Sequence, residues 1–486
     1  MKRFACMILI FTSGCLVGPD YRTPKAPTVA TWSEPLESGL TNREPPIARW
    51  WSVFQDPTLD SLIDRAVKYN HSLRQAEAAV RQSRASVSVA RADLWPSADA
   101  TGAYSRSRNS QNGFLTPPAN VSPNYNLYQA GFDASWELDL FGGTRRAIES
   151  ATANEQAAEF GRDDVLVSLL AEVAVNYVQV RGYQRRIAIA VDDIRSEQDA
   201  LDITQSRFQG GMASDLDVSQ AASVKAATEA AVPSLESALA ASIHHLSTLL
   251  GQPPGALYNE LSAPGSIPAA PPEIPVGLPA DLLRRRPDVR RAERQLAAAT
   301  AQIGVATADL FPAFSLTGSG GLESVSAGDF FTAGSKMWTV GPSVQWRIFD
   351  AGRIRANIRV QNALQEQALE SYETTVLGAF EDAENALAAY AKERSRFVAL
   401  SENVRASQRA LDVATELYSR GMNDFLGVVV EETTLYNAQD QLAQSQTAIA
   451  TDVIALYKAT AGGWERSGPG NQERTETSQE LSLDTE

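Results

Sequence analysis

The sequence predicts an α+β membrane protein in which one structural unit occurs twice, each copy combining a β-hairpin with a long antiparallel helical hairpin. The first observation is a repeat: Ala92–Pro96 (ADLWP) returns 216 residues later as Ala308–Pro312 (ADLFP). The second is strict alternation of apolar and polar residues in both copies. The third is a helical pattern of about 70 residues from Ala351 to Arg420. Such duplication favours a symmetric tube over an enzyme with a single cleft.

The N-terminus is predicted to carry an export signal over residues 1–14, because Lys2 and Arg3 precede a short apolar run. Thr12–Cys15 resembles a bacterial lipoprotein cleavage box, which implies lipidation of Cys15. Leu16 stands where Asp would favour inner-membrane retention, so the resemblance implies the outer membrane. The alternative is ordinary signal cleavage with an incidental cysteine. Cys6 is the only other cysteine, so no disulfide is expected in a mature chain that starts at Cys15.

Residues 15–58 are proline-rich and predict an extended tether, with Trp50, Trp51 and Phe54 as anchors on the folded body. Leu59–Leu94 predicts one helix, which Pro96 stops.

Alternating segments predict one β-hairpin in each copy, over residues 97–141 and 313–350. In the first hairpin the alternation runs without interruption from Tyr128 to Leu140, and in the second it runs from Trp338 to Ile348. Pro342 requires an edge or bulge position. A tilted strand of 13 residues spans roughly 30 Å, the thickness of a bilayer core. The polar register is expected to face a wet lumen, although some members could lie at the barrel ends: Asp133, Glu137, Asp139, Gln345 and Arg347.

The predicted number of strands bears on assembly. A sheet in lipid must close on itself, and the smallest membrane barrels have about eight strands. One chain supplies only four alternating segments, so several chains must share one barrel, and the sequence leaves two, three or four copies open. The alternative is a soluble β-sandwich, although a sandwich needs more strands.

The remainder predicts helices. Apolar residues recur every seven positions, as in a left-handed coiled coil. Outside the signal region no run of 18 apolar residues occurs, so no helix is expected to span a bilayer. The two repeats are expected at 59–265 and 266–464, with helical hairpins at 144–250 and 351–462 and a disordered polar tail at 465–486.

The composition excludes several functions. A net charge of −15 argues against nucleic acid as a partner. The three histidines lack ligand partners at metal-binding spacing, and neither a phosphate-binding loop nor a nucleophile elbow occurs. We therefore expect no enzyme activity, no metal and no cofactor.

Several segments carry a strong resemblance to the outer-membrane factor (TolC-like) family, within its lipoprotein branch that works with resistance-nodulation-division (RND) pumps. They are Gly18–Tyr21, Trp51–Pro57, Leu282–Arg290, Ile303–Ala306, Gly341–Ser343 and Phe349–Arg353. The resemblance implies a homotrimer with a 12-stranded outer-membrane β-barrel continued by a 12-helix periplasmic α-barrel. It also implies two partners, a periplasmic adaptor protein and an inner-membrane RND pump.

The resemblance also assigns sites. The turns at the ends of the helical hairpins match the family's adaptor-docking tips: Gly210, Gly211, Met212, Ser214, Asp215, Gly421, Met422, Asn423 and Asp424. The alternative is a plain helix turn. At the entrance, Val430 stands where the family often carries Asp, and Glu431 and Glu432 follow. Either a glutamate supplies an acidic ring or the gate is hydrophobic.

The function expected from this resemblance is a passive outer-membrane duct that exports small molecules in a tripartite efflux system. Two alternatives stay open: a duct for type I protein secretion, and a coiled-coil lipoprotein without a pore.

Overall fold

The structure is a computed structural model that describes residues 16–25, 31–37, 39–43, 49–110, 122–279, 282 and 285–460. The predicted signal peptide, Cys15 and the tail 465–486 lie outside the described residues. The chain divides into two compact units. The strand unit comprises Met1–Lys25, Ala79–Ala158 and Arg291–Tyr372. The helical unit comprises Ala26–Ala78, Glu159–Arg290 and Glu373–Glu486.

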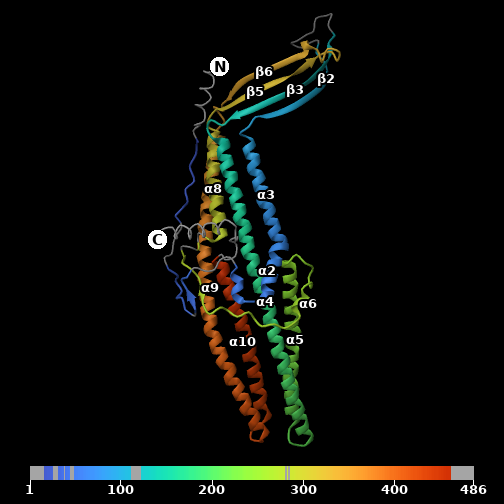
Figure 1. The fold of residues 1–486 in the computed structure, drawn as a ribbon, viewed down its shortest axis with the longest axis vertical. Coiled ribbons are helices and arrows are strands. Elements are labelled where there is room, and N and C mark those ends of the chain that lie inside the picture. The colour runs from blue at the N-terminus through green and yellow to red at the C-terminus, as the bar shows by residue number, and fades with distance from the viewer. Residues whose placement is uncertain are drawn as a thin grey trace, which may run out of the picture. The chain divides into compact units, whose positions relative to one another are not determined.

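The strand unit contains one antiparallel sheet of four strands in the order β2-β3-β5-β6 (Figure 1). The strands are β2 (Ser97–Arg108), β3 (Asn124–Leu138), β5 (Ala313–Ser324) and β6 (Lys336–Gln345). The alternating segments are therefore confirmed as strands, and Pro342 lies on β6, which pairs with a single strand of its own chain.

The ends of two strands were predicted wrongly. The alternation continues to Leu140 and Ile348, whereas β3 ends at Leu138 and β6 at Gln345. After β6, the carboxylate of Asp350 accepts hydrogen bonds from the backbone N–H groups of Gly352 (2.9 Å) and Ile354 (2.8 Å). These bonds satisfy N–H groups at the start of the next helix, so the chain leaves the sheet although its polarity still alternates.

The long helices form two hairpins, and each arm of one hairpin has the same length as the corresponding arm of the other. Helices α4 (Gly143–Gln209) and α9 (Arg353–Ser419) each have 67 residues, and α5 (Asp215–Leu249) and α10 (Phe425–Ala459) each have 35. By length and composition α4 could cross a membrane, but 61% of its most apolar stretch is buried inside the structure, as in the core helix of a soluble domain. Figure 1 shows the short turn that closes each hairpin.

The predicted helix Leu59–Leu94 is two helices, α2 (Pro57–Tyr69) and α3 (His71–Ala92). Asn70 separates them. Its side chain donates to the carbonyl of Leu249 (2.9 Å) and accepts from the N–H of Leu73 (2.9 Å). The backbone of Asn70 is extended (φ −61°, ψ 130°), because a side chain that bonds the neighbouring backbone competes with helical pairing.

The core of the helical unit encloses the predicted tether anchors. Trp50, Trp51 and Phe54 are buried in the 3-10 helix η2 (Trp50–Phe54), and Trp50 stacks on Tyr457 at a centroid distance of 5.3 Å. A two-residue parallel ladder pairs β1 (Leu40–Thr41) with β4 (Ile274–Pro275), and it fixes the tether nearer its N-terminal end. The short helix α6 (Tyr258–Leu261) and helix α8 (Pro287–Ala308) precede the second pair of strands, and the 3-10 turn η3 (Ala333–Ser335) precedes β6.

Candidate functional site: channel wall and entrance

The sheet has one polar face and one apolar face. Register pairs Asp99 with Asp133, Asp133 with Ser319, and Ser319 with Thr339, which forms a polar row across all four strands. Thr101 donates a hydrogen bond to the carboxylate of Asp133 (3.3 Å). Two carboxylates opposite one another are tolerated only where water or counter-ions screen them. This face is therefore suited to a wet lumen.

The opposite face exposes large apolar side chains. Phe132, Trp338, Val340 and Val344 are all largely exposed in the single chain. A contiguous apolar face on a sheet of this length needs a cover, and the hydrocarbon of a bilayer provides one.

Tryptophans mark the junctions between strands and helices. The indole N–H of Trp136 donates to the carbonyl of Leu94 (2.9 Å), and the indole N–H of Trp346 donates to the carbonyl of Leu310 (3.1 Å). Tryptophan with an apolar body and a satisfied N–H is typical of a membrane–water interface.

The predicted lumen residues fall into two groups. Asp133 and Glu137 lie on β3, and Gln345 is the last residue of β6. Asp139 and Arg347 lie beyond the strand ends. Asp139 accepts from the backbone N–H of Arg145 (2.9 Å) and forms an ion pair with the guanidinium of the same residue (3.1 Å), so it anchors the start of α4. Asp99 was missed, although its polar register in Ser97–Arg108 could have identified it.

The two tips are built alike. At the first, Met212 donates to the carbonyl of Arg207 (2.8 Å) and Gly211 to the carbonyl of Phe208 (2.9 Å), a Schellman cap with Gly211 at φ +70°. Equivalent bonds at the second tip join Met422 to Leu417 and Gly421 to Tyr418, with Gly421 at φ +71°. Glycine is required by this left-handed backbone rather than by crowding, since a Cβ at either position would meet no atom within 4 Å.

All nine predicted tip residues are exposed. The return helices start with side-chain caps: Ser214 forms a capping box with Asp217, and Asp424 accepts from the N–H of Gly427 (3.3 Å). The side chains of Met212 and Met422 are exposed next to these caps. Each tip thus presents a flexible apolar side chain on a rigid turn, which suits contact with another protein.

The three predicted gate residues differ in exposure. Val430 is exposed, Glu431 is half-buried and Glu432 is buried within its own chain. A buried side chain cannot line a water-filled entrance, so of the two glutamates only Glu431 has the exposure that an acidic ring needs.

Glu432 instead lies close to two carboxyls of α4, Asp193 and Glu197. Burial, followed by the charge of Glu197, raises the pKa of Glu432 to about 7. Burial, followed by the charges of Glu197 and Glu432, raises the pKa of Asp193 to about 7. Sequence reasoning missed this group because Glu432 lies more than 230 residues from Asp193 and Glu197 in the chain.

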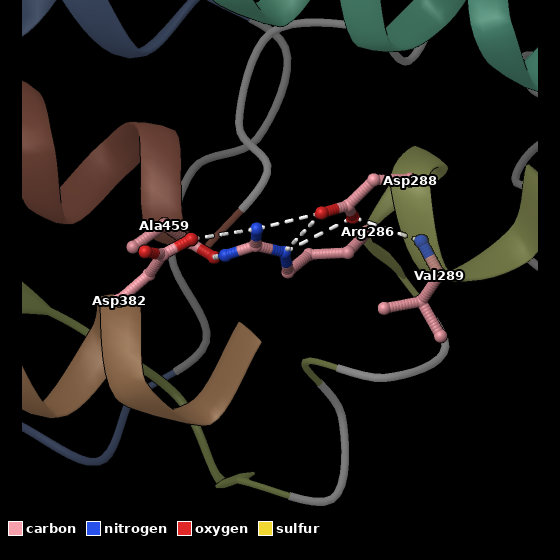
Figure 2. Close-up of polar contacts among 5 residues, drawn as sticks. All are labelled: Arg286, Asp288, Val289, Asp382 and Ala459. Carbon is pink, nitrogen blue, oxygen red and sulfur yellow. Dashed lines mark hydrogen bonds and ion pairs between the residues drawn. The ribbon is translucent and has the colours of Figure 1, made fainter. Parts of the chain in front are cut away.

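A second, half-buried charge lies just before the start of α8. The guanidinium of Arg286 binds Asp288 (2.7 Å) and Asp382 (2.9 Å) and donates to the carbonyl of Ala459 (3.3 Å) (Figure 2). It therefore joins the start of α8 to α9 and to the last turn of α10. The last-turn carbonyls of a helix favour such a cation.

Comparison with known proteins identifies this architecture. The family described as "Outer membrane efflux protein" matches residues 62–252 and 278–462. The chain is 33% identical over 460 residues to Nodulation protein T of Rhizobium leguminosarum bv. trifolii, covering 94% of this chain and 96% of that protein. It is 32% identical over 465 residues to the toluene efflux pump outer membrane protein TtgC of Pseudomonas putida, covering 95% of each.

A solved structure described as the outer-membrane channel OprN superimposes with a TM-score of 0.86 at 37% identity, covering 93% of this chain and all of that one. The family match, the relatives and the fold agree, and the chain belongs to the outer membrane efflux protein family, as an outer-membrane channel component of an efflux system.

Proposed function

We propose that three copies of the chain assemble into one passive duct, with a 12-stranded β-barrel in the outer membrane and a 12-helix α-barrel in the periplasm. The observation that carries this proposal is the sheet of four strands with one polar and one apolar face. In the described part of the chain, β2 and β6 each pair with only one strand. Since lipid tolerates no open edge, β6 of one copy must pair with β2 of the next.

The equal lengths of α4 and α9, and of α5 and α10, support near-equivalent units around the axis. If the halves 59–265 and 266–464 are repeats of one unit, three chains supply six such units. The polar row that contains Asp133 then lines the barrel lumen, together with Glu137 and Gln345, while Asp139 and Arg347 lie at the end of the barrel.

Native mass spectrometry of the detergent-extracted full chain tests this assembly. We expect a complex of three chains, and a complex of two or four would overturn the proposal.

The tips are the surface where a periplasmic adaptor protein docks, and an inner-membrane RND pump drives export through it. Two names support this use: TtgC is named for a toluene efflux pump and OpmQ, 34% identical, for pyoverdine export. Small molecules are therefore favoured as cargo over proteins of a type I secretion system. The exposed Met212 and Met422 supply the apolar contact.

For the gate, we propose that Val430 and Glu431 face the entrance. Glu432 is buried within its own chain and therefore does not line the entrance. Cys15 carries the lipid anchor, and residues 15–58 tether it to the helical unit through the buried Trp50 and Trp51.

Single-channel conductance of a Glu431→Gln variant tests the gate. A loss of cation preference supports an acidic ring at Glu431, and an unchanged preference leaves the hydrophobic gate formed by Val430.

A further inference from the structure

Three carboxyl groups gather inside the helical unit, on the parts of α4 and α10 that lead to the tips. Asp193 and Glu197 lie one turn apart on α4, and Glu432 lies on α10, seven residues after that helix begins. At 1.5 Å per residue, Glu432 is about 10 Å from the start of α10. The group is thus positioned where movement of α10 would change the entrance.

Two of these groups are buried, and Asp193 is half-buried. Glu197 is 3% exposed and Glu432 is 9% exposed. Thr228 of α5 donates its hydroxyl to Glu197 Oε1 (2.9 Å), so the group joins α4, α5 and α10. Among the described residues, Glu197 Oε2 and Asp193 Oδ2 are buried and have no donor when both groups are charged, and the two side chains are within hydrogen-bonding reach of each other once one carries a proton. A buried carboxylate oxygen without a donor is costly, and a bound proton removes that cost.

The surrounding charges do not neutralise the group. Burial raises the pKa of Glu197 and the positive charge of Lys225 on α5 opposes this rise, but Lys225 also forms an ion pair with Glu229 (2.5 Å). On α10, burial and then the charges of Asp440 and Asp193 raise the pKa of Tyr436. The nearby Arg186 of α4 forms an ion pair with Asp440 (2.6 Å). Within the described part of α9, no titratable side chain is among the groups that shift the pKa of these three carboxyls.

We propose that Asp193, Glu197 and Glu432 form a proton-binding latch that regulates the entrance. With protons bound, the three side chains pack together and hold α10 against α4 and α5. When the protons leave, repulsion between carboxylates loosens α10 and favours the open entrance. The link to opening rests on the proposed function of the tips and gate, whereas the latch itself rests only on the packing of these helices.

The sign follows from the raised pKa values. In a loosened state the carboxyls meet water and recover ordinary pKa values near 4, whereas in the packed state those of Asp193 and Glu432 are about 7. The packed state is therefore fully favoured below pH 4, and this preference is lost as the pH rises to about 7. Between pH 5 and 7, loosening increases about tenfold per pH unit for each proton linked.

Hydrogen–deuterium exchange of the full chain in detergent tests the latch without relying on conduction. After correction for the intrinsic pH dependence of exchange, amides of 425–435 should exchange roughly 50-fold more readily at pH 7 than at pH 5 for one linked proton. Glu432→Gln and Asp193→Asn keep the shape without the charge, and each should reduce this dependence. Asp192→Asn is the matched control, because Asp192 adjoins Asp193 but its side chain is 71% exposed and paired with Arg195.

Conductance measured in planar bilayers provides a second test of the latch. We expect the wild-type current to rise from pH 5 to pH 7, and the rise to be smaller in Glu432→Gln. Exchange that is independent of pH in the wild-type protein would overturn the latch, as would an equal effect of Asp192→Asn. A pH-dependent exchange with no current at any pH would preserve the latch and contradict the proposed duct.

Discussion

Arg286 offers the sharpest test of how the helical unit is held together. Its side chain is 12% exposed, and its partners differ: the side chain of Asp288 is 19% exposed and that of Asp382 is 60% exposed. We therefore predict that Arg286→Ala destabilises the helical unit and that most of the loss comes from Asp288.

The magnitude follows from these contacts. Charge-assisted hydrogen bonds to the half-buried Asp288 are worth about 1.5–3 kcal/mol. The ion pair with the exposed Asp382 is screened and contributes less than about 1 kcal/mol. The bond to the carbonyl of Ala459 adds about 1 kcal/mol, so Arg286→Ala should cost about 3–4 kcal/mol in total. Arg286→Lys keeps the charge but loses the fork geometry, and it should recover only part of this energy.

A double-mutant cycle measures the two pairs separately. Unfolding in urea, followed by the helical circular dichroism signal, should give a coupling of about 2 kcal/mol between Arg286 and Asp288 and below about 1 kcal/mol between Arg286 and Asp382. Equal couplings, or a coupling with Asp288 near zero, would refute the reasoning from burial.

Three further predictions concern the tips, the gate and the anchor. Gly211→Ala with Gly421→Ala forces alanine into a left-handed backbone, at about 1 kcal/mol or more per site; dye-efflux assays should show loss of export while chemical cross-linking still detects oligomers in the outer membrane, and normal efflux would contradict the docking role. Glu431→Gln should weaken cation preference in bilayer recordings, with Glu432→Gln as the buried comparison that leaves the preference unchanged. Cys15→Ala should abolish incorporation of labelled palmitate, and persistent labelling would place the lipid elsewhere.

Periodic features could be predicted from the sequence, whereas tertiary packing could not. The alternation in β3 follows from its two chemically different faces, and Pro342 lies on β6, which pairs with a single strand of its own chain. The continued alternation through Ile348 gave no sign that the Asp350 carboxylate would end the strand. The break at Asn70 was hidden for a similar reason: the side chain that interrupts the helix bonds Leu249, which is 179 residues away.

The candidate site shows the same division. The tips were identifiable because Gly211-Met212 and Gly421-Met422 each follow a segment with apolar residues at every seventh position, and a glycine commonly ends a helix. Glu431 and Glu432 were indistinguishable in the sequence, since their exposure depends on which side of α10 faces α4. The cluster of Asp193, Glu197 and Glu432 has no local signature in the sequence. The pKa values of these three carboxyls are raised only because folding brings them together away from water.

Electron cryomicroscopy of the purified full chain in a lipid nanodisc tests the central claim most directly. We predict three copies around one axis, with β6 of each copy paired to β2 of the next and twelve strands enclosing one lumen lined by the Asp133 row. A different number of copies, or a sheet that stays open or turns its Asp133 face toward lipid, would contradict it.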